Sequence, residues 1–190
     1  ERLQVVAGPE NPSYLAFGAD RRVLYAVHGD GEQASAWRIG DDGLLSLINV
    51  APCGGRNPVH LAPTRDGRFI VVANHLSSSV ALLRVRADDG LGEIADLVVL
   101  EGAPGPHRVE QPFAKPHQVV FNPSGETLFV PDTGVDRVFA FRVDGDAGKL
   151  RAVGFSAARE GSGPRHMAFS PDGRFGYVLN ELDSTVLACR

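Results

Sequence analysis

Residues 57–75 read NPVHLAPTRDGRFIVVANH, and the same pattern occurs three more times without gaps. The other copies are NPSYLAFGADRRVLYAVHG at 11–29, KPHQVVFNPSGETLFVPDT at 115–133 and GPRHMAFSPDGRFGYVLNE at 163–181. The second residue of every copy is a proline, which sets the register at Pro12, Pro58, Pro116 and Pro164. Spacings of 46, 58 and 48 residues indicate a repeat architecture, and the longest interval contains an extra loop over residues 102–114.

Each copy predicts a series of short antiparallel strands. A strand follows the proline, a polar turn such as Asp66-Gly67 comes next, and a more apolar strand such as FIVVA at 69–73 follows. Glycine tolerates the positive φ of a hairpin turn, and β-branched and aromatic residues suit a buried pleated surface. A third, alternating strand and a fourth strand complete the unit. Four strands in about 40 to 50 residues are typical of a β-propeller blade.

Two other fold classes fit the chain less well. A helical fold needs apolar residues at positions i, i+3, i+4 and i+7, and glycine or proline interrupts every window of useful length. A β-sandwich also uses short strands, but it does not require near-identical units. The sequence therefore predicts an all-β fold, a β-propeller of four-stranded antiparallel blades that is seven-bladed when complete.

The repeat divides residues 1–190 into the parts of a single partial propeller. We expect complete blades at 11–56, 57–114 and 115–162 and an incomplete blade at 163–190. Residues 1–10 are expected to end a preceding blade, with LQVVA at 3–7 as its last strand. About half of the ring is then present, and open blades leave strand edges exposed. Further blades of the same protein, or a second chain, are expected to close the ring.

The repeat also predicts a core between neighbouring blades. Apolar side chains at repeat positions of the first two strands are expected to be buried there: Phe17, Leu61, Phe121, Phe169, Tyr25, Val71, Phe129 and Tyr177.

Composition and charge argue against several classes of function. There are 19 Lys and Arg against 23 Asp and Glu, so the net charge of −4 gives no reason to expect a nucleic-acid surface. The chain has no run of 18 apolar residues, so no membrane span is predicted. Cys53 and Cys189 lack metal-like spacing and fit reduced thiols, which favours a cytoplasmic location.

Positions at which the copies disagree are the candidates for function, because positions that agree serve the fold. The residue after the proline is Ser13, Val59, His117 or Arg165, and the next is Tyr14, His60, Gln118 or His166. Just past the second strand the copies carry Gly29, His75, Thr133 or Glu181, and the position before these is polar throughout: His28, Asn74, Asp132 and Asn180.

Equivalent positions of successive blades gather around the propeller axis at one end of the channel. His117, Arg165 and Glu181 are therefore the expected catalytic residues, since a base, a cation and an acid suit proton transfer on an anionic substrate. His60, His75, His166 and Asn180 are expected to bind substrate beside them. Structural roles remain open at this point: hydrogen-bonded histidines at 60 and 166, a salt bridge for Arg165, and a turn cap for Glu181. No metal and no cofactor are expected, because no histidine pair has close ligand spacing.

The sequence resembles the lactonase propeller family, which contains bacterial 6-phosphogluconolactonases and fungal carboxymuconate cyclases. The resemblance covers essentially the whole chain, and GPRHMAFSPDGRFGYVLNELDSTV from residue 163 is its most specific part. It implies an active site with the histidine of the PH segment, the arginine of GPRH and the glutamate of NEL, which are His117, Arg165 and Glu181. The family's usual PHxH pattern is Pro116-His117-Gln118 here, so one flanking histidine is absent or shifted. The resemblance also implies a further active-site arginine beyond residue 190.

The resemblance implies hydrolysis of a sugar lactone, with 6-phosphogluconolactone converted to 6-phosphogluconate in the pentose phosphate pathway. The substrate partner would be a small anionic lactone. Two alternatives stay open: a carboxymuconate cyclase-like isomerase, and a non-catalytic propeller that binds a partner.

Overall fold

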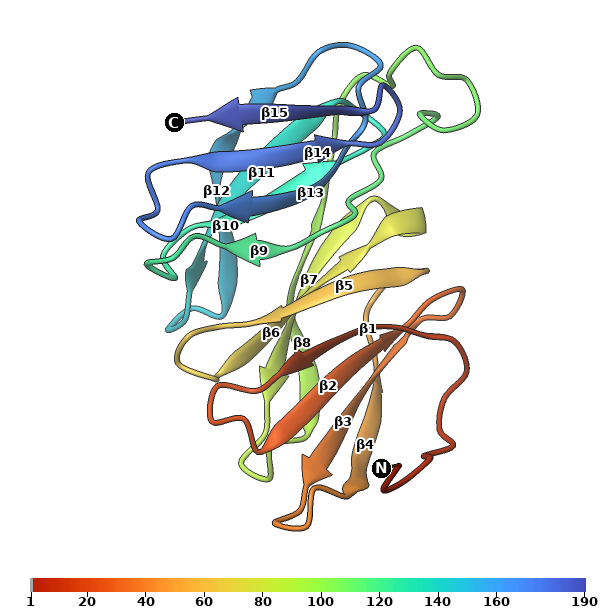
Figure 1. Ribbon diagram of the computed structural model, residues 1–190, viewed down its shortest axis with the longest axis vertical. Helices are drawn as coiled ribbons and strands as arrows, with labels where there is room; N and C mark the ends of the chain where they lie inside the picture. Colours follow the sequence, from red (N-terminus) through yellow and green to blue (C-terminus); the bar gives the residue numbers. More distant parts are fainter. Residues whose placement is uncertain (1) are drawn as a thin grey trace.

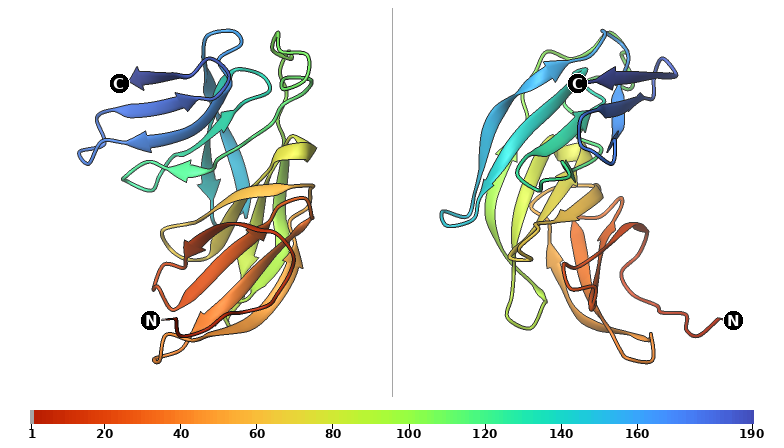
Figure 2. Two further views of the ribbon diagram at one scale, coloured as in Figure 1. Left: turned by 45° about the vertical axis from the view of Figure 1, so that its right-hand side comes forward. Right: turned by 60° about the vertical axis from the view of Figure 1, so that its left-hand side comes forward.

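The computed structural model describes residues 2–190, which form four antiparallel sheets that follow one another along the chain (Figures 1 and 2). The first sheet has β1 (Pro12–Phe17), β2 (Val23–His28), β3 (Gln33–Ile39) and β4 (Leu45–Pro52). The second has β5 (Pro58–Pro63), β6 (Phe69–Asn74), β7 (Ser79–Val85) and β8 (Leu91–Val99). The third has β9 (Val120–Phe121), β10 (Leu128–Asp132), β11 (Arg137–Asp144) and β12 (Lys149–Ala157). The fourth has β13 (Pro164–Phe169), β14 (Gly176–Asn180) and β15 (Thr185–Cys189).

Strand order within every sheet follows the sequence, so the predicted all-β partial propeller is confirmed. The described residues contain one short 3-10 helix, His75–Ser77, and none of their helical segments has the length and apolar character needed to cross a bilayer. The strand expected over residues 3–7 does not form. The side chain of Gln4 hydrogen-bonds the backbone N–H and carbonyl of Leu45 at the start of β4, but the backbone of residues 3–7 pairs with no described strand.

In two of the sheets, an aspartate and a glycine stabilise the polar turn between the first and second strands. In the second sheet, Asp66 Oδ1 accepts hydrogen bonds from the Thr64 hydroxyl and the Arg68 N–H, and Gly67 takes a φ of 70°. Asp172 and Gly173 repeat this arrangement in the fourth sheet. A side-chain acceptor at the turn and a residue free to adopt positive φ fix the hairpin register.

A β-bulge at the start of the first strand positions the residues that differ between copies. Pro58 pairs with Asn74, but His60 pairs with Ala73, so Val59 is an extra residue in the ladder. The fourth sheet has the same shift between Pro164 and His166, which makes Arg165 its extra residue. Bulges redirect side chains and are frequent beside functional sites.

One backbone hydrogen bond recurs in all four units and closes the same end of each sheet. The N–H after the second strand donates to the carbonyl of the residue before the proline, as from Glu181 to Gly163 at 2.8 Å. The equivalent donors are Gly29, His75 and Thr133. The residue past the second strand therefore lies beside the bulge of its own sheet.

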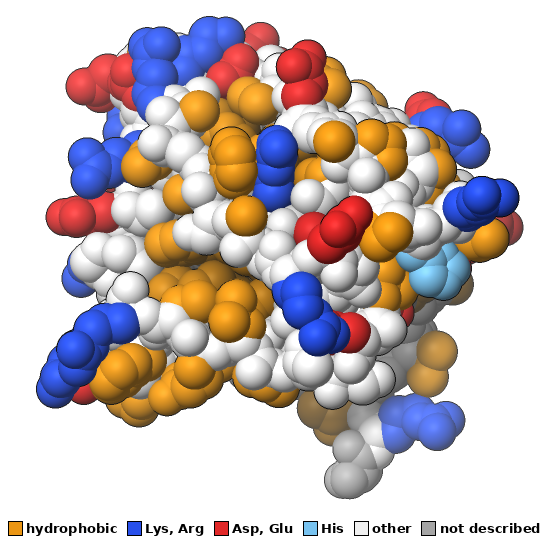
Figure 3. Space-filling view, turned by 90° about the horizontal axis from the view of Figure 1, so that it is seen from above, with side chains coloured by type: hydrophobic (Ala, Val, Ile, Leu, Met, Phe, Trp, Pro, Cys, Tyr) orange, Lys and Arg blue, Asp and Glu red, His pale blue; other side chains and the backbone are white. Residues whose placement is uncertain are grey.

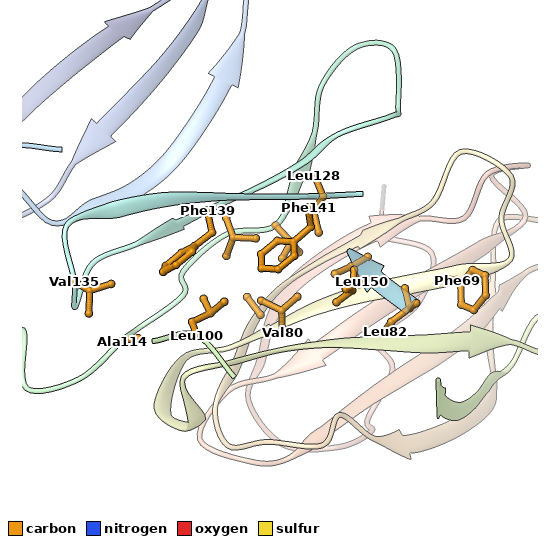
Figure 4. Close-up of a cluster of buried hydrophobic side chains, with 14 residues drawn as sticks. Phe69, Val80, Leu82, Leu100, Ala114, Leu128, Val135, Phe139, Phe141 and Leu150 are labelled. Carbon is orange, nitrogen blue, oxygen red and sulfur yellow. The ribbon is translucent and has the colours of Figure 1, made fainter. Parts of the chain in front are cut away.

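The largest core cluster lies between the second and third sheets, with Phe69, Leu82, Leu128, Phe139 and Phe141 among its members (Figure 4). A second cluster joins the first and second sheets, and a small third one joins the third and fourth. Apolar side chains on facing sheets are removed from water together, which holds neighbouring blades side by side.

Most of the predicted core residues are inside, but two are not. Leu61, Tyr25 and Val71 are at most 3% exposed, and the side chains of Phe121, Phe129 and Phe169 are half-buried. Phe17 and Tyr177 are exposed, at 57% and 43%. Phe17 is on the face of the first sheet opposite Ala16, which packs on the second sheet. Tyr177 likewise alternates with Val178, which packs on the third sheet. Both therefore face the side of their sheet on which no described sheet lies, and Figure 3 shows apolar side chains on the surface at the fourth-sheet end.

Replacing Leu128 by alanine should destabilise the protein by about 2–5 kcal/mol, since its side chain is fully buried between two sheets and a cavity would remain. Phe17→Ala is the comparison, and it should change the free energy of unfolding much less because the Phe17 side chain is already exposed. Urea unfolding of both variants measures the difference. Equal losses would show that the interface between the second and third sheets is not the main core.

Candidate active site

Arg165 brings the three expected catalytic residues together. It leaves the bulge of β13, and its Nε lies 3.1 Å from His117 Nε2 and 3.2 Å from Glu181 Oε2. His117 precedes β9 in the neighbouring sheet, where its N–H donates to the Pro131 carbonyl at 3.0 Å. Glu181 is held beside Arg165 by the recurring hydrogen bond to Gly163. A histidine, an arginine and a glutamate from two sheets thus meet in one group, held by a hydrogen bond to His117 and an ion pair with Glu181.

Aromatic rings from all four units form a row next to this group. His117 lies between His75 and His166, with ring centroids 5.3 and 5.0 Å away. His166 is followed by His60 at 6.3 Å, and Tyr14 stacks on His60 at 3.7 Å. We call Tyr14, His60, His166, His117 and His75 the ring row. Residues from blades far apart in sequence converge there, as expected for one end of a propeller axis.

The histidines of the ring row are held neutral. Burial lowers the pKa of His60 to about 3, helped by the nearby His166. Burial and then the positive charge of Arg165 lower the pKa of His117 to about 3 as well. The pKa values of His75 and His166 are also lowered, chiefly by burial. At neutral pH these rings therefore act as hydrogen-bond acceptors or bases rather than as cations.

Arg165 Nε–H points at His117 Nε2, so that nitrogen accepts and the ring proton of a neutral His117 belongs on Nδ1. His117 Nδ1 and His60 Nδ1 are buried and have no hydrogen-bond partner among residues 2–190. Buried polar atoms without a partner cost stability and mark places where a ligand or water completes the bonding.

Asn180 has a structural contact rather than one with the ring row. Its side chain is buried, and Nδ2 donates to the Thr185 hydroxyl at 3.0 Å. Asn74 makes the equivalent bond to Ser79 in the second sheet, and His28 bonds Ser35 in the first. This contact recurs between sheets, but Asn180 Oδ1 is buried and has no hydrogen-bond partner among residues 2–190, so the substrate-binding role of Asn180 stays a prediction.

Tyr14 is the member of the ring row that the sequence reasoning missed. It occupies the same repeat position as His60 and His166, which was the available signal. Among residues 2–190 no three His, Cys, Asp or Glu side chains are arranged to hold a metal ion. A cavity of about 470 Å³ is lined by the turn after β5 and by Arg142, and is therefore at the other end of the second sheet from the ring row.

Stability should fall as the pH is lowered from 6.5 towards 3, because His60 binds a proton more readily when unfolded. Its folded pKa of about 3 is below its unfolded value, so the stabilisation is complete above about pH 6.5 and is lost on acidification. Its contribution is about 1.4 kcal/mol per pH unit within this window. His60→Gln should flatten a plot of unfolding free energy against pH between 6.5 and 5. Parallel plots for the two proteins would mean that His60 is not held neutral by the fold.

Comparison with known proteins gives the same family along the whole chain. The family model described as "Lactonase, 7-bladed beta-propeller" matches residues 1–190. A 6-phosphogluconolactonase of Formosa agariphila is 32% identical over 189 residues, covering 94% of this chain and 52% of the relative. The 6-phosphogluconolactonase of Bacillus subtilis is 30% identical over 182 residues, covering 94% and 51%.

Among solved structures, the periplasmic gluconolactonase of Pseudomonas aeruginosa superposes with a TM-score of 0.87 at 35% identity. The superposition covers 97% of this chain and 55% of the Pseudomonas chain. The chain thus spans about half the length of the relatives it matches. With the repeat, the four successive antiparallel sheets and the match over every residue, the chain belongs to the lactonase family of seven-bladed β-propellers.

Proposed function

We propose that the whole protein hydrolyses a sugar lactone, 6-phosphogluconolactone, to 6-phosphogluconate. The observation that carries the proposal is the position of Arg165, whose guanidinium lies between His117 and Glu181 at one end of four converging blades. The names of the Formosa and Bacillus relatives support this substrate. We also propose that 11–56, 57–114 and 115–162 are blades of a ring that further blades complete.

A lactone is an activated ester, so hydrolysis needs a more nucleophilic water and a stabilised oxyanion. Neutral His117 takes a proton from water as the water oxygen attacks the carbonyl carbon. The bond from this carbon to the ring oxygen then breaks, and the same proton passes from His117 to the ring oxygen. Arg165 stabilises the negative charge that develops on the carbonyl oxygen, since its planar fork donates two hydrogen bonds.

Glu181 is a positioning residue in this scheme. Its carboxylate pairs with Arg165 Nε at 3.2 Å and so fixes the guanidinium beside His117. The same Nε–H donates a hydrogen bond to His117 Nε2. An anionic substrate draws the guanidinium to itself and offsets its charge, which frees Nε2 and raises the pKa of His117 towards the useful range for a base.

Hydrolysis fits the charge state of His117 better than the cyclase-like isomerase reaction. Closing a muconate to a lactone needs a proton donor to the carbanion-like carbon. With a pKa of about 3, His117 begins unprotonated at neutral pH, which suits a reaction whose first proton transfer is from water to the histidine. A cytoplasmic location stays within the proposal and rests on the free thiols of Cys53 and Cys189; the Pseudomonas relative is named as periplasmic.

The test is the initial rate of 6-phosphogluconate formation by the whole protein at pH 7, with the spontaneous rate subtracted. A rate proportional to protein concentration is expected. If 6-phosphogluconate binds but no lactone is turned over, the non-catalytic binding propeller becomes the better account.

A further inference from the structure

Lys115 occupies a repeat position that the fold does not reserve for a long side chain. The residue before the proline is Asn11, Asn57 or Gly163 in the other units, and these adopt positive φ angles of 50°, 52° and 63°. In the third unit the loop over 102–114 leads into this position by another path, and the residue is a lysine. The backbone role is kept, since the Lys115 carbonyl accepts the recurring hydrogen bond from the Thr133 N–H. The side chain is therefore the part that differs.

The ammonium group of Lys115 is almost buried but weakly paired. Its side chain is 10% exposed, and Nζ lies 5.7 Å from the Phe113 ring centroid. Glu110 Oε2 lies 3.7 Å from Nζ, beyond hydrogen-bond distance, and the Glu110 side chain is 52% exposed. Such a pair contributes little, so a buried cation is left with bonding capacity that a stronger anion can use.

The segment that carries Lys115 lies against the end of the ring row. His75 Nδ1 is 3.3 Å from the Pro116 carbonyl, and the Ser78 hydroxyl donates to the Ala114 carbonyl at 2.6 Å. Burial lowers the pKa of His75, the hydrogen bond to Pro116 opposes this, and the positive charges of Lys115 and then Arg165 lower the pKa further. Both cations thus act on one ring of the row, and His117 adjoins that ring.

The loop that supplies Glu110 is fixed at its C-terminal part. Gln111 is 1% exposed and donates to the Thr133 carbonyl at 2.9 Å. A Cβ on Gly134 would lie 1.8 Å from the Phe113 carbonyl oxygen, so the loop passes directly over a glycine. Glu110 is consequently held near Lys115.

We propose that Lys115 binds the phosphate group of the lactone and that this phosphate replaces Glu110 as its counter-ion. The inference rests on the proposed function, because it assigns one end of that substrate. A phosphate dianion pairs more strongly with an ammonium than an exposed carboxylate does. Arg165 is then left for the carbonyl end of the ring. Lys115 would be the residue that separates phosphorylated from unphosphorylated lactones.

The experiment measures binding and turnover separately on the whole protein. Calorimetry gives the Kd of 6-phosphogluconate and of gluconate, and kinetics gives KM for 6-phosphogluconolactone and glucono-1,5-lactone. The variants are Lys115→Met and Glu110→Gln. Lys149→Met is the matched control, because Lys149 is 48% exposed and pairs with Asp96 on another part of the surface.

Lys115→Met should raise the Kd of 6-phosphogluconate and the KM of its lactone about 10- to 100-fold, with the values for the unphosphorylated compounds unchanged. Glu110→Gln should lower the Kd of 6-phosphogluconate about two- to fivefold, because the competing carboxylate is gone. Lys149→Met should change neither. Equal effects on both classes of compound, or none on either, would overturn the role of Lys115. If the wild type binds 6-phosphogluconate through Lys115 but turns over no lactone, the proposed hydrolysis fails and the phosphate site stands.

Discussion

His117→Gln is expected to lower kcat for 6-phosphogluconolactone by about 10²–10⁴-fold, with a smaller change in KM. Glutamine has a similar reach but cannot take a proton from water at neutral pH. The loss should therefore fall on the chemical step, while Arg165 and the ring row still hold the substrate. Steady-state kinetics with the spontaneous rate subtracted gives both constants.

Lys149→Met is the control for this prediction. Lys149 is 48% exposed and pairs with Asp96 away from the ring row and the Arg165 group, so its replacement should leave kcat within about twofold of the wild-type value. A His117→Gln variant that folds and keeps full turnover would remove His117 from the mechanism.

Arg165→Ala is expected to lower kcat/KM by about 10²–10³-fold for both phosphorylated and unphosphorylated lactones. The guanidinium carries the positive charge that faces the developing oxyanion, and its removal also leaves Glu181 without its partner. Arg165→Lys should recover only part of the loss, because an ammonium cannot offer the two-pronged hydrogen bonding of a guanidinium.

Arg142→Ala is the matched control. It also removes an arginine side chain, from an exposed position in β11, and should leave kcat/KM unchanged. Full activity in Arg165→Lys would show that charge alone is needed there. No loss in Arg165→Ala would leave the Arg165 group as a salt bridge that only joins two blades.

The fold could be predicted because its determinants are local. A proline that sets the register, a polar turn with one residue at positive φ and an apolar second strand repeat in each unit, and each feature specifies its own hairpin. The burial of Phe17 and Tyr177 could not be predicted in the same way. Alternation along a strand gives the face on which a side chain lies, but not whether a neighbouring sheet covers that face.

The convergence of His117, Arg165 and Glu181 followed from comparing the units, since equivalent positions of successive blades meet at one end. Chemical reactivity does not single out Tyr14 as a site residue, although its ring stacks on His60. The repeat does not predict a binding role for Lys115, because the same position is a turn residue in the other units. The hydrogen bond from Asn180 to Thr185 depends on strand pairing that the sequence does not display, and the binding role of Asn180 stays a prediction.

A double-mutant cycle between His117 and Arg165 tests the central claim most directly, because the claim is that these two residues form one active site. The measurement is kcat/KM for 6-phosphogluconolactone in the wild type, His117→Gln, Arg165→Ala and the double variant of the whole protein. Groups that act as a unit lose their activity together, so the double variant should be about as slow as the slower single variant. Losses that multiply would mean that His117 and Arg165 act independently and would contradict the account.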